Sequence, residues 1–202
     1  MANRIKDAIY EAGLYLFRNI SNYEFIVLGD NIPSQSLIAS NHFGTLDPFL
    51  INQGLERKLI SISGGSGGLF LPPHFIPGVG RIDLSKGLRK AIKTAEEYKE
   101  KGYSILIFPE GNTAAKINEE DIFEMKRGVF YFSEKLNLPI LPISLRGVQN
   151  IWPKIPNKRF PLLNGKVILN VGREIKSSEI GECPCERLRD EISNLYKQSK
   201  LI

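Results

Sequence analysis

The order of its apolar segments is the feature that most limits the fold of this 202-residue chain. Short runs rich in Ile, Leu and Val alternate with longer stretches in which apolar residues recur at helical spacing. This alternation predicts strand–helix–strand units around a largely parallel sheet, because parallel strands need a crossover connection. The run at 104–109 (SILIFP) is almost wholly apolar, as expected for a strand buried on both faces.

The expected strands lie at 23–28, 37–41, 58–63, 79–84, 104–109, 139–145 and 166–172. Helices are expected at 2–20, from Asp47 onward, at 86–101, near 122–136 and at 184–199. The predicted fold class is α/β: one domain with a mixed, largely parallel sheet flanked by helices. We expect it to divide into an N-terminal amphipathic helix (1–20), an α/β core (21–175) and a C-terminal helix (176–202).

Two segments bear on membrane contact. The helix at 2–20 has two apolar stripes, so one face would pack on the core, and the other would meet the core, another subunit or lipid. The loop at 152–165 combines Trp152 and Phe160 with basic residues, which suits a bilayer interface and equally an ordinary surface loop. No run reaches the roughly 20 apolar residues of a spanning helix. We expect a cytoplasmic protein that is peripheral on the inner face of the cell membrane.

Charge and cysteine content limit the kinds of partner and metal site that we expect. The chain has 27 Lys and Arg against 22 Asp and Glu, which favours phosphorylated metabolites, anionic lipid or nucleic acid. Nucleic acid is not expected, because no basic stripe is interleaved with aromatic residues. Cys183 and Cys185 are too few for a disulfide framework, and His42 and His74 lie far from them in sequence, so no metal site is expected.

One short motif after the second expected strand carries acid–base chemistry: Asn41-His42-Phe43-Gly44-Thr45-Leu46-Asp47-Pro48. Asp47 before Pro48 predicts a helix start, with the carboxylate as N-cap and proline at the first helical position. A tight turn eased by Gly44 would bring Asp47 to His42. A carboxylate that accepts one ring N–H leaves the other nitrogen as a general base. The alternative is that Asp47 only caps the helix and His42 is structural.

A second motif, Phe108-Pro109-Glu110-Gly111, ends the most apolar strand. Pro-Glu-Gly is ordinary turn chemistry, but a charged residue at the end of a central strand predicts a substrate-binding role for Glu110. Residues 64–68 (GGSGG) also match the Gly-x-Ser-x-Gly pattern of serine hydrolases by letter. Pro72 and Pro73 interrupt the helix that this pattern requires, so a hydrolase acting through Ser66 is a distant alternative.

The two motifs, in this order, resemble the hallmark blocks of the glycerophospholipid acyltransferase superfamily, typified by 1-acylglycerol-3-phosphate acyltransferase. Asn41, His42 and Asp47 match its pattern of Asn-His, four residues, then Asp, and residues 108–111 match its Phe-Pro-Glu-Gly block. Further matches are Gly80-Arg81-Ile82-Asp83, Lys126-Arg127-Gly128 and Ile140-Leu141-Pro142-Ile143. The resemblance runs from about residue 20 to about residue 175.

The resemblance implies an acyltransferase in which His42 deprotonates an acceptor hydroxyl and Asp47 orients its ring, as in a serine hydrolase without the serine. The donor would be acyl-CoA or acyl carrier protein, and the default acceptor the lysophospholipid 1-acylglycerol-3-phosphate. No acyl-enzyme, metal or cofactor is implied. With His42 and Asp47 as the catalytic pair, the substrate-binding candidates are Gly44, Thr45, Arg81, Glu110, Gly111, Lys126 and Arg127.

Two positions depart from the family pattern. Thr113 and Leu84 stand where the family carries arginines associated with the acceptor phosphate, and neither replaces a bidentate guanidinium. Nearby cations would then supply the charge: Arg81, Lys86, Arg89, Lys126 and Arg127. Two alternatives stay open: transfer to a hydroxyl or amine of an acceptor that is not a glycerophosphate, and a lipid- or membrane-binding relative without turnover.

Overall fold

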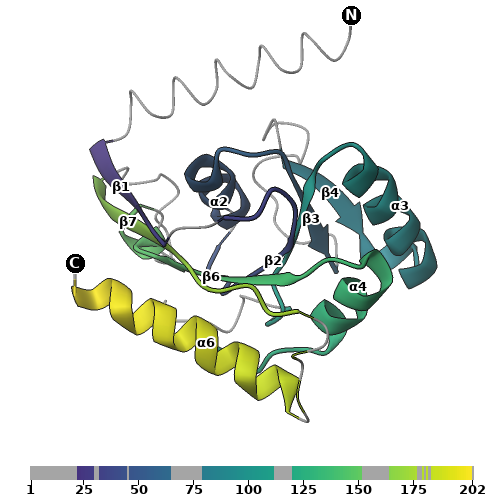
Figure 1. Ribbon diagram of the computed structural model, residues 1–202. Coiled ribbons are helices and arrows are strands. Elements are labelled where there is room, and N and C mark those ends of the chain that lie inside the picture. Colours follow the sequence, from purple (N-terminus) through teal and green to yellow (C-terminus); the bar gives the residue numbers. More distant parts are fainter. Residues whose placement is uncertain are drawn as a thin grey trace, which may run out of the picture.

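The computed structural model describes residues 22–29, 32–44, 46–64, 79–111, 120–151, 164–176, 179, 181 and 183–201. The expected helix at 2–20 and almost all of the loop at 152–165 lie outside these residues, so both stay predictions. In the described part, seven strands form one sheet in the order β1-β7-β6-β2-β5-β3-β4 (Figure 1). This sheet confirms the predicted α/β class.

The strands lie close to the apolar runs that predict them. They are β1 (Asn22–Leu28), β2 (Leu37–Ser40), β3 (Leu59–Ser63), β4 (Val79–Asp83), β5 (Ser104–Ile107), β6 (Ile140–Arg146) and β7 (Asn164–Val171). Every neighbouring pair is parallel except β6 and β7, which are antiparallel. Because β2, β3, β4 and β5 run in the same direction, their carboxyl ends meet at one edge of the sheet, where chemistry is expected.

Helices cover both faces of this sheet (Figure 1). Two of them pack on one face, α2 (Asp47–Leu55) and the short α5 (Val148–Ile151). The other face carries α3 (Leu88–Glu100), α4 (Gly128–Leu136) and α6 (Pro184–Gln198). Short 3₁₀ helices precede α3 and follow α6, at η1 (Leu84–Lys86) and η3 (Ser199–Leu201).

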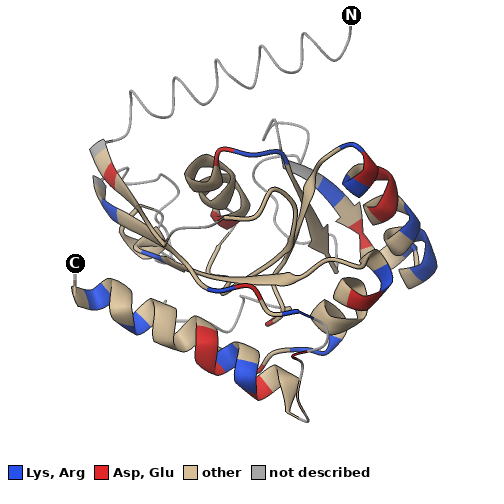
Figure 2. Cartoon of the chain, in the orientation of Figure 1, with Lys and Arg blue, Asp and Glu red and all other residues tan. Residues whose placement is uncertain are grey.

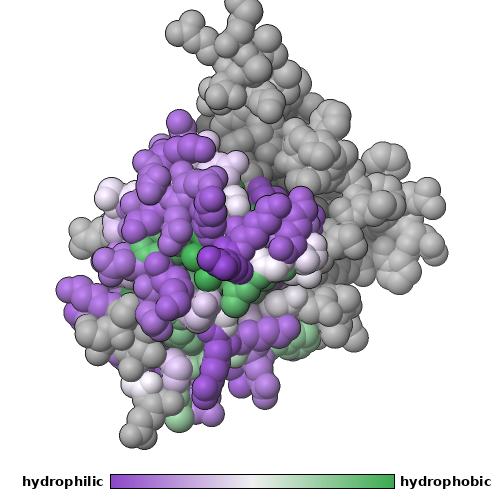
Figure 3. All heavy atoms as spheres, turned by 90° about the vertical axis from the view of Figure 1, so that its right-hand side faces the viewer, coloured by the Kyte–Doolittle hydropathy of each residue, from purple (hydrophilic) through white to green (hydrophobic). Residues whose placement is uncertain are grey.

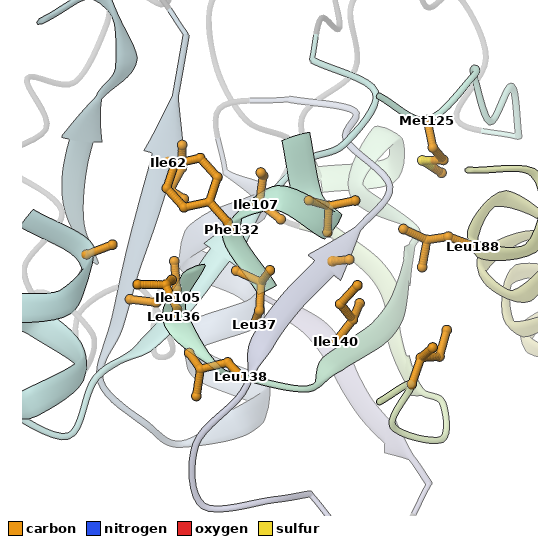
Figure 4. Packing of buried hydrophobic residues seen from close by; sticks show 14 of the residues in the cluster. Leu37, Ile62, Ile105, Ile107, Met125, Phe132, Leu136, Leu138, Ile140 and Leu188 are labelled. Atoms are coloured by element: carbon orange, nitrogen blue, oxygen red, sulfur yellow. The ribbon is translucent and has the colours of Figure 1, made fainter. Parts of the chain in front are cut away.

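The core consists of two apolar clusters, one on each face of the sheet. Alternate residues of β2 enter different clusters: Leu37 packs on the side of α3, α4 and α6, and Ile38 on the side of α2. Figure 4 shows the first cluster, with Phe132 of α4 and Leu188 of α6 packed around the sheet. Full burial of one such side chain contributes roughly 1.5–3 kcal/mol, so the central strands are firmly held.

The polar surface follows the helices. Charged residues are frequent along α3, α4 and α6 and in the loops (Figure 2). The side of the molecule that carries α3 is mostly hydrophilic with a small apolar area (Figure 3). Ala91 and Ala95 of α3 are buried, and the partly buried Ile92 and Tyr98 pack against the same core cluster.

The helix expected near 122–136 begins only at Gly128, so its predicted start is wrong. Residues 120–126, called here the 120–126 segment, run without helical structure beside the end of β5. Two of its backbone N–H groups donate outside the segment, that of Phe123 to Glu110 and that of Lys126 to the carbonyl of Pro109. Ile122 and Met125 are buried, so an extended segment imitates the apolar spacing of a helix.

Candidate active site

His42 and Asp47 meet at the carboxyl end of β2. The His42 Nδ1 atom lies 2.6 Å from Asp47 Oδ2. A carboxylate only accepts hydrogen bonds, so Nδ1 carries the proton and Nε2 is the basic nitrogen. Asp47 is fully buried, whereas 22% of the His42 side chain is exposed. This is the arrangement of a general base oriented by a carboxylate.

Asp47 does not cap its helix. Leu46 occupies the N-cap position of α2 without a side-chain cap, so the expected carboxylate cap is wrong. The Oδ2 atom of Asp47 instead accepts the backbone N–H groups of Phe43 (2.6 Å) and Gly44 (2.9 Å). The reading of Asp47 as no more than a helix cap therefore fails. Its carboxylate fixes the turn and the imidazole together.

The turn after β5 holds His42 from the other side. The ring of Phe108 stacks on the imidazole, with centroids 3.9 Å apart and planes inclined by 16°. Glu110 is 4% exposed, and its Oε1 accepts the backbone N–H of His42 at 2.9 Å. Its Oε2 accepts the N–H of Phe123 at the same distance. Glu110 thus has backbone partners, and its predicted substrate contact stays a prediction.

Asn41 belongs to the site although it was not among the predicted site residues. Its side chain is buried, donating to the carbonyl of Leu145 (2.9 Å) and accepting the N–H of Leu145 (2.8 Å). The amide continues the pairing of β2 with β6 one residue beyond the end of β2. The sequence signal was its place directly before His42 in the family motif.

Gly111 and Lys126 are in contact. Gly111 has a φ of +75°, a conformation that favours glycine, and its N–H donates to the carbonyl of Phe108 at 3.0 Å. A Cβ atom at Gly111 would lie 2.7 Å from Nζ of Lys126. The Lys126 side chain therefore lies against the turn that holds His42. Arg127 follows it as the exposed N-cap residue of α4.

The other predicted binding residues are spread more widely. Arg81 lies on β4 in register with Ser61, and the sheet order puts β5 and β3 between β4 and β2. Three strand spacings are about 14 Å, so the structure does not place Arg81 beside His42. Gly44 contributes its N–H to Asp47, and Thr45 lies outside the described residues.

Five backbone N–H groups at or beside the two turns are already engaged. The N–H groups of His42, Phe43 and Gly44 donate to carboxylates, and those of Gly111 and Lys126 donate to carbonyls. An oxyanion-stabilising donor must point at the developing charge. None of these five groups is available for that purpose, so the donors must come from other groups.

Charge at the end of β4 is mixed. The hydroxyl and N–H of Ser85 donate to Asp83 at 2.7 and 2.9 Å, and these bonds lower the pKa of that carboxyl. The positive charges of Arg81 and Lys86 lower it further. Asp83 therefore stays ionised and offsets part of the basic charge at this strand end.

Within the described ranges, no three or more His, Cys, Asp or Glu side chains gather in a way that could hold a metal ion. No helix in the same ranges combines the length and apolar character needed to cross a bilayer.

Comparisons with known proteins agree with the sequence resemblance and with the fold. A family model described as Acyltransferase matches residues 24–146. The chloroplastic 1-acyl-sn-glycerol-3-phosphate acyltransferase BAT2 of Brassica napus is 27% identical over 88% of this chain and 53% of its own length. The 1-acyl-sn-glycerol-3-phosphate acyltransferase of Pseudomonas aeruginosa is 27% identical over 73% of this chain and 59% of its own length. The chain thus spans little more than half the length of these curated relatives.

A solved structure shows the same fold. The crystal structure of the 1-acyl-sn-glycerophosphate (LPA) acyltransferase PlsC from Thermotoga maritima covers 98% of this chain and 80% of its own, with a TM-score of 0.68 at 21% identity. The family match includes both the turn from His42 to Asp47 and the turn at 108–111. The family match spans more than half of the chain and agrees with the sequence resemblance, so this protein belongs to the acyltransferase family.

Proposed function

We propose that this protein transfers a fatty acyl group from a thioester donor to a hydroxyl of 1-acylglycerol-3-phosphate. The observation that carries the proposal is the 2.6 Å contact of His42 Nδ1 with the buried Asp47, which makes the partly exposed imidazole a base. Family membership supports acyl transfer. The names of the relatives from Brassica napus and Pseudomonas aeruginosa support the acceptor.

In the proposed reaction the acceptor itself is the nucleophile. Its hydroxyl oxygen attacks the thioester carbonyl carbon while Nε2 of His42 takes the hydroxyl proton. The tetrahedral intermediate collapses with cleavage of the carbon–sulfur bond, and the imidazolium returns the proton to the departing thiolate. Asp47 stabilises the imidazolium and keeps the ring in one tautomer. The products are an ester and a free thiol, with no acyl-enzyme.

The hydrogen bonds of the two turns limit which groups can assist the reaction. Five backbone N–H groups at or beside these turns are engaged, so we assign to side-chain cations the neutralisation of the negative charges of the substrates and of the intermediate. Lys126 is the best-placed candidate, because its side chain lies against Gly111, next to the residue that holds the His42 backbone. Arg127 and Arg81 would extend this positive region towards α4 and β4. An acceptor phosphate is the natural counterpart for such charges.

Donor and location belong to the same proposal. The donor is acyl-CoA or acyl carrier protein, because the mechanism requires only a thioester. The acceptor is a membrane lipid, so the protein acts from the cytoplasm at the inner face of the cell membrane. The helix at 2–20 and the aromatic and basic loop at 152–165 would make the contact.

A second acceptor class has one observation in its favour. Leu84, where the family carries an arginine, packs against the apolar cluster under α3 and presents no charge. A site without that arginine suits an acceptor other than a glycerophosphate, reacting through a hydroxyl or an amine. A panel of acceptors separates the two classes.

The panel pairs palmitoyl-CoA, and in parallel palmitoyl carrier protein, with five acceptors: 1-acylglycerol-3-phosphate, lysophosphatidylglycerol, lysophosphatidylcholine, monoacylglycerol and sphingosine. Mass spectrometry identifies the product. We expect 1-acylglycerol-3-phosphate to give the highest kcat/KM. Lys126→Met should lower that value about tenfold more than the value for monoacylglycerol, since a lost charge–phosphate contact costs about 1.4 kcal/mol or more.

Lys135→Met is the matched control, because Lys135 lies on α4 with its ammonium over the ring of Tyr131. It should leave every acceptor unchanged. A clear preference for monoacylglycerol or sphingosine would contradict the glycerophosphate assignment. No product from folded protein with either donor would support a lipid-binding relative without turnover.

A further inference from the structure

The carboxylate of Glu110 is buried beside the catalytic pair, yet the proposed reaction gives it no chemical role. We infer that Glu110 is a positioning residue that fixes the backbone of His42 relative to the 120–126 segment. This inference rests on the proposed role of His42 as the base. It replaces the expected substrate contact of Glu110 with a contact inside the protein.

Both oxygens of Glu110 are committed to backbone groups. Oε1 accepts from His42 and Oε2 from Phe123, each at 2.9 Å, and 4% of the residue is exposed. Burying an ionised carboxylate is unfavourable unless hydrogen bonds compensate. A side chain this well enclosed, with both oxygens bonded, has little surface to offer an acceptor.

Glu110 completes a three-way restraint on His42. Asp47 fixes ring atom Nδ1, Phe108 fixes the plane of the ring, and Glu110 fixes the main chain. Phe108 and Glu110 come from the same turn, so a shift of that turn would move both restraints together. The direction in which Nε2 points therefore depends on Glu110 although Glu110 does not touch the ring nitrogens.

The second oxygen links His42 to the 120–126 segment. That segment also carries Lys126, whose N–H donates to Pro109 at 2.8 Å. Its other end is held to the C-terminal part of the chain by a 2.7 Å ion pair between Glu120 and Lys200. The carboxylate of Glu110 thus sets the distance between the base and the cation proposed for substrate binding.

A carboxylate suits this junction better than an amide. Two backbone N–H groups approach from different chain segments, and each needs an acceptor. Glutamine has the same shape but only one acceptor atom, and its NH₂ group would face one of the two donors. Glu110→Gln therefore breaks one bond with little change in volume. Glu110→Asp keeps the charge but is one methylene too short to reach both donors.

The matched control is Asn170→Ala. Asn170 is buried on β7, which β6 separates from β2 in the sheet, and it donates to the carbonyl of Leu195 in α6 at 2.9 Å. This variant removes a buried side-chain bond to backbone of the same kind. Thermal unfolding of the three variants shows how much each weakens the fold.

The kinetic readout is acyl transfer to 1-acylglycerol-3-phosphate. Glu110→Gln should lower kcat about tenfold to 100-fold, as misplacement of a catalytic group does, with the KM for the acceptor changed less than about twofold. Glu110→Asp should act in the same direction, and Asn170→Ala should leave kcat unchanged. A higher acceptor KM with normal kcat would mean that Glu110 binds substrate and would overturn the inference.

An independent readout is the NMR signal of the His42 ring. The chain has two histidines, His42 and His74, so the signals of His42 are those missing from His42→Ala. The stacked ring of Phe108 should shift the His42 ring protons upfield. Glu110→Gln should move them towards free histidine, and Asn170→Ala should not. Unchanged signals in both Glu110 variants would overturn the inference. This readout needs no turnover, so it decides the positioning role even if the proposed reaction proves wrong.

Discussion

At the residue scale, Asp47 concentrates its hydrogen bonds on one atom. Its Oδ2 accepts from the His42 ring and from the N–H groups of Phe43 and Gly44. Its Oδ1 is buried without a hydrogen-bond partner among the described residues. Three donors on one oxygen make the carboxylate specific for the Nδ1–H tautomer of His42. For the orientation of His42, the charge and position of the Asp47 carboxylate therefore matter more than any capping of α2.

Asp47→Asn tests this specificity. The amide keeps the shape of the side chain, but its NH₂ group donates a hydrogen bond where the carboxylate oxygen accepts one. It therefore favours the tautomer of His42 that carries the proton on Nε2. We expect kcat to fall by about 10³–10⁴, as for the equivalent change in the serine-protease triad. Asp190→Asn, an exposed position on α6, should have no effect. Activity within about tenfold of wild type in folded Asp47→Asn would mean that Asp47 does not orient a base.

The sequence predicts part of this site. The five-residue spacing of His42 and Asp47 indicated that they meet, and the structure brings them together. The sequence does not predict the contacts of Asn41 with Leu145 or of Glu110 with Phe123. Those partners come from other strands and segments, and no local pattern specifies which backbone group a buried amide or carboxylate will meet.

At the element scale, apolar runs locate strands well and helix starts poorly. The strand at 104–109 is reproduced as β5 at Ser104–Ile107. The start of α4 was misplaced by six residues, because buried residues of an extended segment imitate helical spacing. The short helix α5 gave no signal, since its four residues are fewer than two helical turns.

Gly147 allows the chain that leaves β6 to approach β7 closely. It follows β6 with a φ of +90°, and a Cβ atom there would lie 1.9 Å from the carbonyl oxygen of Lys166 in β7. Gly147→Ala combines backbone strain with a clash against main chain. We expect the free energy of unfolding to fall by about 3 kcal/mol or more, measured by urea denaturation.

Gly102→Ala is the control for the strain alone. Its φ is +80°, but nothing lies within 4 Å of the added atom. It should cost about 1 kcal/mol. Equal losses in the two variants would show that the close approach of β6 and β7 at Gly147 is not a constraint.

At the scale of the whole molecule, the parallel strands determine where the site lies. Alternating strands and helices predicted a largely parallel sheet, and hence chemistry at its carboxyl edge. The strand order could not be predicted from the sequence. It depends on contacts between distant segments, because β1 pairs with β7 and β7 pairs antiparallel with β6. The N-terminal helix and the membrane contact stay predictions.

The fold and the two turns support one central claim: His42 is the base that activates the acceptor. The most direct measurement compares thiol release from palmitoyl-CoA and 1-acylglycerol-3-phosphate by wild type, His42→Ala and Ser66→Ala. We predict acceptor-dependent release by wild type and Ser66→Ala, and a loss of at least about 10³-fold in His42→Ala. Unaltered release by folded His42→Ala would contradict it, and loss in Ser66→Ala alone would point to a serine hydrolase.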